Sequence, residues 1–213
     1  DPNKVLDLAF YMLIASIIGS RILYVLVNWP MFRDDLLEIF QLWHGGLVFY
    51  GGFIGAVLTA LWYVRWKGLL LWKTADIIAP SIAFGQFVGR IGCFFAGCCY
   101  GKVCELPWAV TFTHAESLAP KAVPLHPTQL YGSLIALLIF LTLTALKRIK
   151  RFEGVLFWTY VLLYGIARSV LESFRGDERG MLIQNMISTS QLIGVIMASL
   201  AIVMLIVLRK RHA

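Results

Sequence analysis

Long apolar segments, separated by short stretches that hold most of the charged residues, constrain this chain more than any other feature. A helix that crosses a bilayer needs about 20 mainly apolar residues, because the membrane offers its backbone no other hydrogen-bond partner. Six such segments cover residues 5–28, 47–66, 74–97, 129–146, 154–175 and 187–208. The sequence therefore predicts an all-α fold, a polytopic transmembrane helical bundle with six spanning helices, in a single domain over residues 1–213.

Composition supports a membrane protein and argues against a nucleic-acid partner. Hydrophobic residues make up 59% of the chain, whereas soluble domains use about 45–50% even when glycine is counted. The net charge of +7 would suit nucleic acid if it formed one basic face. The basic residues instead form short clusters between apolar segments, as in cytoplasmic loops of membrane proteins. We expect a lipid bilayer around the chain and no nucleic acid.

The charges of the connecting segments predict the orientation. One set of termini and connections is almost purely basic, with Lys4, then Arg65, Lys67 and Lys73, then Lys147, Arg148, Lys150 and Arg151, then Arg209, Lys210 and Arg211. The alternate connections mix acidic and basic residues. Because cytoplasmic loops are enriched in Lys and Arg, both termini are expected in the cytoplasm. The segment 98–128, rich in Pro, Gly, Cys and Trp, is then an outward-facing loop region.

Three arginines, Arg21, Arg90 and Arg168, lie inside the predicted helices. Each stands seven residues before the outer end of its helix, a depth of about 10 Å at about 1.5 Å per residue. Ionisable residues within spanning helices are rare and usually functional. Guanidinium groups at one depth suggest a shared anion, and phosphate fits because it accepts two parallel hydrogen bonds. The alternative is that these side chains extend to the membrane interface.

Other polar residues share a helix face with two of these arginines. The stripe on the fifth predicted helix contains Tyr164, Arg168, Glu172 and Arg175. Arg168 and Glu172 are spaced to pair along the helix, either to orient Arg168 toward a ligand or as a structural ion pair. The corresponding face of the third predicted helix contains Gln86, Arg90 and Cys93. Asp76, near the inner end of that helix, is expected to be structural.

A glycine-rich run with one histidine precedes and opens the second predicted helix, from His44 to Gly52. Its four glycines let the backbone approach a ligand or a neighbouring helix. His44 is a candidate general base, because an imidazole pKa of about 6.5 suits proton abstraction at neutral pH. Its alternative role is that of a polar interface residue. His126 precedes the fourth helix, which Pro127 and Thr128 begin, and is expected to cap that helix or anchor the loop.

All four cysteines, Cys93, Cys98, Cys99 and Cys104, fall in one short stretch. The paired C-x-x-C spacing of a zinc site is absent, which disfavours a metal. A disulfide from Cys104 to Cys98 or Cys99 is compatible with an oxidising compartment, whereas the adjacent Cys98 and Cys99 are poorly placed to bridge each other. Packing of small apolar side chains and a nucleophile activated by a neighbouring base stay open.

An ordered set of short motifs runs along nearly the whole chain. The set comprises Gly19-Ser20-Arg21 with Tyr24, His44-Gly45-Gly46-Leu47 with Tyr50-Gly51-Gly52, Asp76 through Ala79-Pro80, Gly85-Gln86 with Gly89-Arg90 and Gly92, Gly101, His126-Pro127-Thr128-Gln129-Leu130-Tyr131, Tyr164-Gly165 with Arg168, and Glu172 with Phe174-Arg175. No single motif is decisive, but the ordered set is specific. It resembles the prolipoprotein diacylglyceryl transferase family.

This resemblance implies a reaction and a site. The family moves a diacylglyceryl group from phosphatidylglycerol to the lipobox cysteine thiol of a prolipoprotein, forming a thioether and releasing glycerol phosphate, on the outer side of the bacterial inner membrane. It implies no cofactor and no metal. The family's essential residues map to His44, Arg90 and Arg168, which are expected to be catalytic. The residues expected to bind substrate are Arg21, Tyr50, Gln86, Arg90, Gly101, Gln129, Tyr131, Tyr164, Glu172 and Arg175.

Three residues depart from the family pattern. Cys93 stands where the family usually has Asn, and Cys98 and Gly132 stand where it usually has Glu. The family also usually has one more helix upstream, so the sequence is expected to be a fragment or a processed form. Two other functions stay open, a lipid-headgroup transferase paralogue with a different acceptor and a non-enzymatic lipid-binding or transport protein. The ordered motifs disfavour the transport protein.

Overall fold

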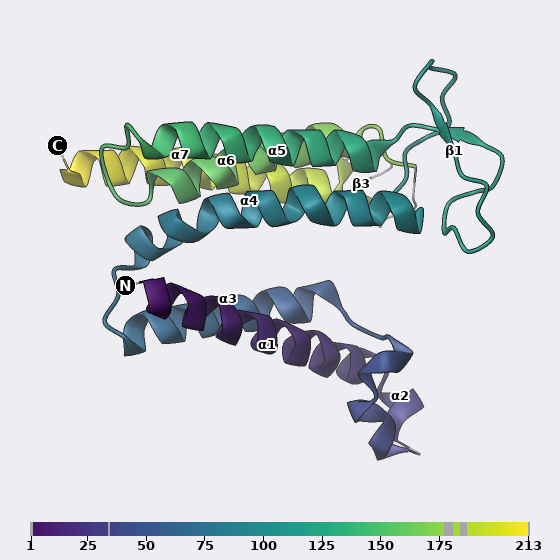
Figure 1. Cartoon of the computed structure of the whole chain (residues 1–213), viewed down its shortest axis with the longest axis horizontal. Coiled ribbons are helices and arrows are strands. Elements are labelled where there is room, and N and C mark those ends of the chain that lie inside the picture. Colours follow the sequence, from purple (N-terminus) through teal and green to yellow (C-terminus); the bar gives the residue numbers. More distant parts are fainter. Residues whose placement is uncertain (1, 34, 177–180, 184–186, 213) are drawn as a thin grey trace. The chain divides into compact units, whose positions relative to one another are not determined.

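The computed structural model describes residues 2–33, 35–176, 181–183 and 187–212 and is mostly helical (Figure 1). It divides into two compact units, Asp1–Thr74 and Ala75–Ala213, which we describe separately. The first unit contains α1 (Pro2–Val27), α2 (Trp29–Phe32), the short 3₁₀ helices η1 (Leu36–Phe40) and η2 (Leu42–His44), and α3 (Phe49–Trp66). The second contains α4 (Leu71–Ala96) from Ala75 onward, β1 (Val110–Thr111), β2 (Pro124–Leu125), α5 (Thr128–Lys147), α6 (Val155–Glu172), β3 (Met181–Ile183), β4 (Ile187–Ser188) and α7 (Thr189–His212).

Among the described residues, five helices are long and apolar enough to cross a membrane. They are α1, α4, α5, α6 and α7. The chain is thus a polytopic membrane protein, as the apolar segments predicted. The remaining predicted segment, 47–66, forms α3, which has 18 residues. It is not among the five, because its glycines, tyrosines, tryptophans and arginine lower its hydropathy.

In the first unit α1 packs against α3 along a contact made by glycines. A Cβ atom on Gly19 would collide with the backbone oxygen of Gly51, and one on Gly55 would lie 2.5 Å from the backbone oxygen of Ala15. Close backbone approach through small residues is a common way for helices to associate in a bilayer, where burial from water supplies no driving force. Of the two roles expected for the glycine-rich run, approach to a neighbouring helix is confirmed for Gly51.

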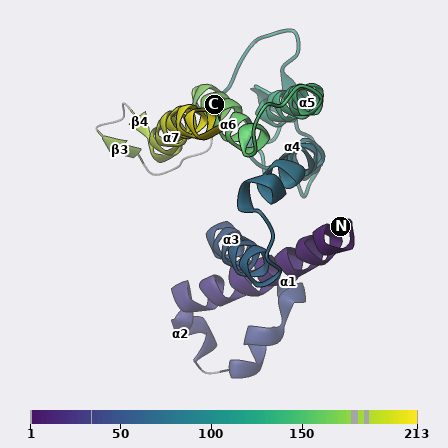
Figure 2. The same ribbon diagram turned by 90° about the vertical axis from the view of Figure 1, so that its left-hand side faces the viewer.

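In the second unit α6 packs against both α5 and α7, as the end-on view in Figure 2 shows. Gly165 of α6 and Gly194 of α7 face each other, and a Cβ on either would lie 2.8 Å from the other's carbonyl oxygen. Helix α4 joins the bundle through α5, where Ser133 Oγ donates a hydrogen bond of 3.0 Å to the carbonyl of Phe87. The second unit therefore brings α4, α5 and α6 together around a common space.

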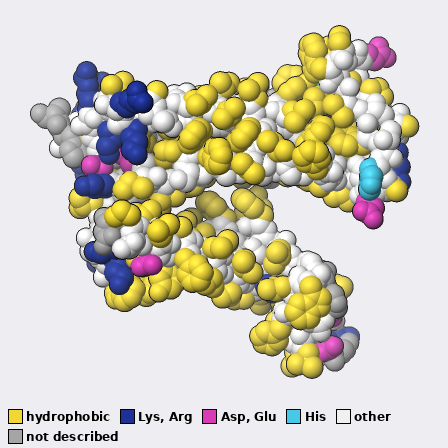
Figure 3. Space-filling view, in the orientation of Figure 1, with side chains coloured by type: hydrophobic (Ala, Val, Ile, Leu, Met, Phe, Trp, Pro, Cys, Tyr) yellow, Lys and Arg dark blue, Asp and Glu magenta, His cyan; other side chains and the backbone are white. Residues whose placement is uncertain are grey.

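Side-chain types change along the second unit. In Figure 3 a band of hydrophobic side chains covers the middle of its helices, and Lys and Arg gather where α5 meets α6 and α7 ends. The basic residues of these segments are Lys147, Arg148, Lys150, Arg151, Arg209, Lys210 and Arg211. The opposite end carries the 98–128 region with its two-stranded sheet, β1 and β2. An apolar band with charge at its ends is the surface that a bilayer requires.

Asp76 has the structural role that was expected. Its side chain is almost fully buried and accepts hydrogen bonds from the backbone N–H groups of Gly154, at 2.9 Å, and Phe157, at 3.0 Å. These N–H groups belong to the start of α6, where helical backbone donors have no partner within the helix. Lys150 Nζ lies 3.4 Å from the same carboxylate. Asp76 therefore fixes the first turn of α6 against α4.

We expect Asp76→Asn to destabilise the protein by about 1–2 kcal/mol, in the range of a lost helix cap. The amide retains one acceptor oxygen but places an NH₂ group where a second acceptor is needed. Thermal unfolding in detergent micelles measures the change. Glu153→Gln is the matched control, because Glu153 contacts the same Lys150 from a partly exposed position. An equal fall in melting temperature for both variants would contradict the capping role.

Candidate active site

An open pocket lies between α4, α5 and α6 of the second unit and encloses about 310 Å³ that no atom fills, part of it continuous with solvent. It is lined by Gln86, Arg90, Gly132, Ile135, Ala136, Tyr164, Ala167, Arg168 and Leu171. Four of these nine residues were predicted as site residues from the sequence, namely Gln86, Arg90, Tyr164 and Arg168. The structure thus brings into one pocket the two arginines that were expected to be catalytic and two residues that were expected to bind substrate.

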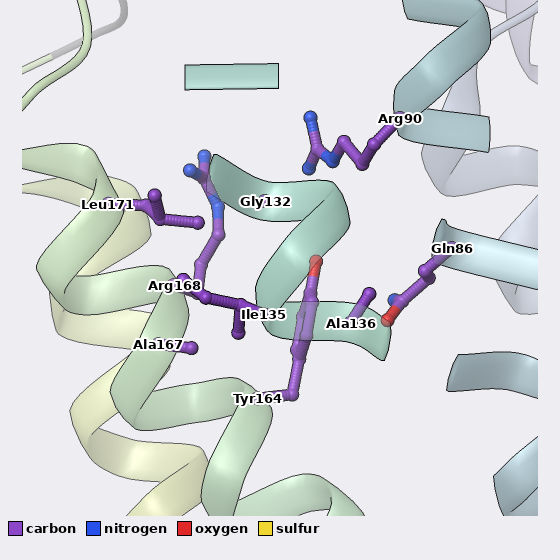
Figure 4. Close-up of a pocket in the computed structure, with 9 residues that line it drawn as sticks. All are labelled: Gln86, Arg90, Gly132, Ile135, Ala136, Tyr164, Ala167, Arg168 and Leu171. Carbon is purple, nitrogen blue, oxygen red and sulfur yellow. The ribbon is translucent and has the colours of Figure 1, made fainter. Parts of the chain in front are cut away.

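Arg90 and Arg168 reach the pocket from different helices. Figure 4 shows both guanidinium groups pointing toward the same end of the pocket, with the hydroxyl of Tyr164 directed toward that end as well. Gly132 of α5 lies beside Arg90, and a Cβ built on it would be 3.5 Å from the Arg90 side chain. The missing side chain at Gly132 leaves room for the guanidinium of Arg90 and places no carboxylate next to it.

A buried carboxylate holds two arginines at the end of α6. Glu172 Oε2 lies 2.7 Å from Arg168 Nη1 and 4.0 Å from Arg175 Nε, and none of the three side chains is more than 15% exposed. Arg168 Nη2 also donates a hydrogen bond of 3.0 Å to Ser190 Oγ of α7. Arg90 lines the pocket opposite Arg168, and no acidic side chain is among the described residues that line the pocket. The excess positive charge makes this region suited to an anion.

Gln86 supplies an unused polar atom at the pocket. Its side-chain oxygen is buried and has no hydrogen-bond partner among the described residues. Buried acceptors in proteins nearly always have a partner, and an exception calls for an explanation. Gln86 lines the pocket on the side opposite Arg168 (Figure 4). A hydroxyl of a bound ligand would satisfy this oxygen.

Two predicted binding residues hold the 98–128 region in place and do not line the pocket. Gly101 donates its N–H to the carbonyl of His126 at 3.0 Å and pairs with Arg175 as an isolated bridge. A Cβ on Gly101 would lie 2.5 Å from the Cβ of His126, so no larger residue fits. The Tyr131 hydroxyl accepts a 2.7 Å hydrogen bond from Trp108 Nε1. The loop-anchoring role expected of His126 is confirmed.

Three of the four cysteines form a cluster at the end of α4. The Sγ atoms of Cys93, Cys98 and Cys99 all lie within 4.8 Å of one another, and none of the four cysteines forms a disulfide. The cluster includes Cys93 and leaves out Cys104, which the disulfide hypothesis had paired with Cys98 or Cys99. The sequence reasoning missed this arrangement.

A helix-terminating turn explains why these thiols meet. Gly97 has φ +68° and donates its N–H to the carbonyl of Phe94 at 3.1 Å, while Cys98 donates its N–H to the carbonyl of Cys93 at 3.2 Å. This is the Schellman pattern, which brings the side chains at the first and last of its six positions into contact. Here those side chains are Cys93 and Cys98. The available signal in the sequence was Gly97, because glycine adopts the left-handed conformation that such a turn requires.

Two side chains of helix α5 fix the backbone of Cys98 and Cys99. Gln129 Nε2 donates to the carbonyl of Cys98 at 2.7 Å, and Thr128 Oγ1 donates to the carbonyl of Cys99 at 2.8 Å. Cys99 has φ +59°, a left-handed conformation that non-glycine residues rarely adopt. Gln129, expected to bind substrate, is fully buried and serves this turn. The cluster is therefore held by fixed backbone on both sides.

In the first unit, Arg21 uses its guanidinium to order the loop after α2. It donates hydrogen bonds to five backbone carbonyls, those of Glu38, Ile39, Gln41, Gly45 and Gly46, at 2.6–3.2 Å. A guanidinium has five N–H donors, so these contacts match its full capacity. Only 6% of Arg21 is exposed. Arg21 therefore orders this loop, and the anion contact expected of it stays a prediction.

The other two predicted site residues of the first unit lie close to this loop in the sequence. Tyr50 is in the first turn of α3 and is 62% exposed. His44 ends η2, and its side chain lies outside the part of the chain that the structure describes. The backbone carbonyls of Gly45 and Gly46, which follow His44 directly, accept hydrogen bonds from Arg21. Arg21 therefore fixes the backbone that carries His44.

Sequence comparison identifies the family. The prolipoprotein diacylglyceryl transferase model matches residues 1–207. The chain belongs to this family. The phosphatidylglycerol–prolipoprotein diacylglyceryl transferase of Clostridium tetani is 38% identical over 193 residues, 91% of this chain and 76% of that protein. The enzymes of the same name from Geobacter sulfurreducens and Aeromonas hydrophila are 34% and 36% identical, over 98% of this chain and 80% and 76% of their own lengths.

The apolar walls of the pocket were not predicted as site residues. Ala167 and Leu171 lie three residues from Tyr164 and Arg168 on α6, and Ile135 and Ala136 follow Gly132 by a turn of α5. Residues three and four apart share a helix face. The stripe that contains Tyr164 and Arg168 therefore held the signal for Ala167 and Leu171, whereas the α5 residues needed the packing of α5 against α6.

The neighbouring thiols of Cys98 and Cys99 differ in acidity. Burial raises the pKa of Cys98 to about 12, and the charge of Cys99 adds to this effect. Burial also acts to raise the pKa of Cys99, but a hydrogen bond with Arg175 and the positive charges of Arg175 and Arg90 outweigh it and bring the pKa below that of an ordinary cysteine. As pH rises, Cys99 therefore becomes a thiolate before Cys98 does.

We expect iodoacetamide to alkylate Cys99 at lower pH than Cys98, because the thiolate is the reactive form. Peptide mass spectrometry after labelling across a pH series measures the two profiles separately. In Arg175→Gln the labelling profile of Cys99 should move to higher pH, since the main stabilising partner of the thiolate is lost. Labelling of Cys98 before Cys99, or a Cys99 profile unchanged in Arg175→Gln, would contradict this assignment.

Proposed function

We propose that the pocket between α4, α5 and α6 binds the phosphate of phosphatidylglycerol during diacylglyceryl transfer. The chain is a membrane transferase of lipoprotein biosynthesis that moves a diacylglyceryl group from phosphatidylglycerol to prolipoproteins. The observation that carries the site is the pair Arg90 and Arg168, whose guanidinium groups point toward the same end of one pocket. Phosphate is the part of this donor that guanidinium groups recognise best.

The arginines act on the charge that develops as the donor lipid is cleaved. The acceptor thiolate of the lipobox cysteine attacks the glycerol carbon of the diacylglyceryl group, a C–S bond forms and the C–O bond to phosphate breaks. The electron pair leaves with the phosphate oxygen as glycerol phosphate. Arg90 and Arg168 neutralise this leaving group, and donors preorganised around a developing charge give the largest catalytic effects.

Other residues of the site position these groups. Glu172 orients Arg168 through its 2.7 Å ion pair, and Arg175 extends the same cluster toward the 98–128 region. The unpartnered oxygen of Gln86 is suited to accept a hydrogen bond from a hydroxyl of the glycerol headgroup. Tyr164 directs its hydroxyl toward the end of the pocket where the two guanidinium groups lie (Figure 4). Gly101, Gln129 and Tyr131 support the site through the backbone around it.

His44 is the proposed general base for the acceptor thiol. This assignment rests on its residue type and on the family motif His44-Gly45-Gly46-Leu47, in which it takes the place of the essential histidine. An imidazole titrates near neutral pH and accepts a proton from a thiol there. The order imposed on the following backbone by Arg21 supports a fixed position for His44.

The proposed orientation places the site toward the outer side of the bacterial cytoplasmic membrane. It uses six spanning helices, with α3 added to the five that meet the length and composition criteria. The basic residues at one end of the second unit (Figure 3) then lie in the cytoplasm with both termini. The 98–128 region and the pocket end of α4 lie toward the lipobox peptide of the prolipoprotein.

The transferase assay with phosphatidylglycerol and a lipobox peptide tests the site. We expect Arg90→Lys and Arg168→Lys to lower kcat/KM by roughly 10²–10³-fold, the loss seen when one preorganised donor is removed. Lysine keeps the charge but not the two-pronged geometry. His44→Ala should abolish the same activity through loss of the base. Thioether product, measured by mass spectrometry, is the readout.

Arg148→Lys is the control, because Arg148 is exposed and follows the last residue of α5, whereas the pocket residue Gly132 lies near the start of that helix. It should keep the activity of the unchanged protein. Full activity in either pocket lysine variant would remove that arginine from the mechanism. Failure of the unchanged protein to form any thioether product would overturn the proposed reaction.

The orientation predicts which side of the membrane each cysteine can be labelled from. In right-side-out vesicles a membrane-impermeant maleimide should label Cys104 of the 98–128 region. A cysteine introduced as Lys210→Cys, in a Cys104→Ser background, should react only after the membrane is permeabilised. Peptide mass spectrometry identifies the labelled sites. The reverse pattern would invert the proposed topology.

A further inference from the structure

The cysteine cluster at the end of α4 has no role in the mechanism above. We propose that Cys93, Cys98 and Cys99 form a zinc site whose fourth coordination position takes the acceptor thiol of the prolipoprotein. The proposal rests on the proposed function for the identity of that thiol. The site itself rests on the geometry of the cluster.

The three sulfur atoms are close to the spacing that zinc requires. They lie within 4.8 Å of one another. A tetrahedral Zn²⁺ with Zn–S bonds of about 2.3 Å separates its sulfur ligands by roughly 3.8 Å. Closing the cluster around an ion therefore needs sulfur movements of about 1 Å or less, which rotation about the Cys side-chain bonds supplies.

The backbone around the cluster is already fixed. The Schellman turn at Gly97 places Cys93 and Cys98 side by side. The side chains of Gln129 and Thr128 hold the carbonyls of Cys98 and Cys99 at 2.7 and 2.8 Å. A site whose ligands are positioned by the fold binds metal without the entropy cost of gathering them.

Among the described residues the cluster supplies three ligands, which is the number that catalytic zinc sites use. Within the described residues, the cluster contains these three thiols and no fourth His, Cys, Asp or Glu. Structural zinc sites have four protein ligands, whereas catalytic ones have three and leave a position open. All three cysteines are half-buried, so the open position is within reach of a ligand from outside.

The charges around the cluster suit a thiolate complex. Zn²⁺ with three thiolates carries one negative charge, and a fourth thiolate adds another. Arg175 hydrogen-bonds the Cys99 thiol, and Arg90 lies close enough for its charge to act on that thiol. These guanidinium groups compensate the negative charge of the filled site. The same two arginines connect the cluster to Glu172 and to the pocket.

Zinc suits the acceptor step because it binds a thiol in its deprotonated form. The acceptor Cys–SH loses its proton to water or to a general base and enters the open position as a thiolate. Its sulfur then forms the C–S bond to the glycerol carbon as the C–O bond to phosphate breaks. The product thioether is a weaker ligand than a thiolate and leaves the metal, and Zn²⁺ undergoes no redox change.

Metal binding by the full chain tests the site directly. Protein purified in detergent is reduced with a phosphine, stripped with a chelator and dialysed against Zn²⁺, and bound zinc is measured by elemental analysis. We expect about one zinc per chain, as for one three-thiolate site. Cys93→Ser, Cys98→Ser and Cys99→Ser should each lose it, whereas Cys104→Ser, the matched control from the same loop, should retain it. No bound zinc in the unchanged protein, or full binding in the three variants, would overturn the site.

Cobalt substitution tests the open position. Co²⁺ bound to the cluster should show a thiolate-to-metal charge-transfer band, and a lipobox peptide should increase it. The same peptide with Ser in place of its Cys should leave the band unchanged. Equal spectra with the two peptides would overturn acceptor binding to the metal. Zinc-free protein that retains its full transferase rate would overturn the role of zinc while leaving the proposed transferase function intact.

Discussion

The buried carboxylate of Glu172 is the interaction on which the rest of the site depends. Arginine side chains placed together away from water repel one another and lose hydration. Glu172 offsets this for Arg168 and Arg175 at once, and it leaves Arg90 without a carboxylate of its own in the pocket. The result is a fixed region of excess positive charge, which a phosphate can enter without displacing the ion pairs that hold it together.

Arg175 links this charged cluster to the turn that carries the cysteines. Its backbone pairs with Gly101, and its side chain contacts both Glu172 and Cys99. The same turn is held from α5 by Thr128 and Gln129. The pocket and the thiol cluster are therefore connected within the second unit by ion pairs and hydrogen bonds that run through Glu172 and Arg175.

Hydropathy and charge predicted much of the fold but not the details of the site. The apolar segments predicted the five long helices to within a few residues, since each must satisfy its own backbone. Arg90 and Arg168 stood out because charge inside such segments is rare. The partners of Arg21 could not be predicted, because they are backbone carbonyls of the η1–η2 loop. The thiol cluster depends on the left-handed turn at Gly97, which spacing rules for metal motifs do not describe.

The three departures from the family pattern all lie beside Arg90 or in the turn that ends α4. The carboxylate usual at position 132 would lie beside Arg90, where a Cβ is already 3.5 Å from that side chain. The Asn and Glu usual at positions 93 and 98 would lie in the Schellman turn. This chain has a thiol and a glycine in place of the two carboxylates, and the thiol of the neighbouring Cys99 interacts with Arg175 and Arg90, which lower its pKa. Because thiolates bind soft cations, the thiols at positions 93 and 98 are the departures on which the proposed metal site depends.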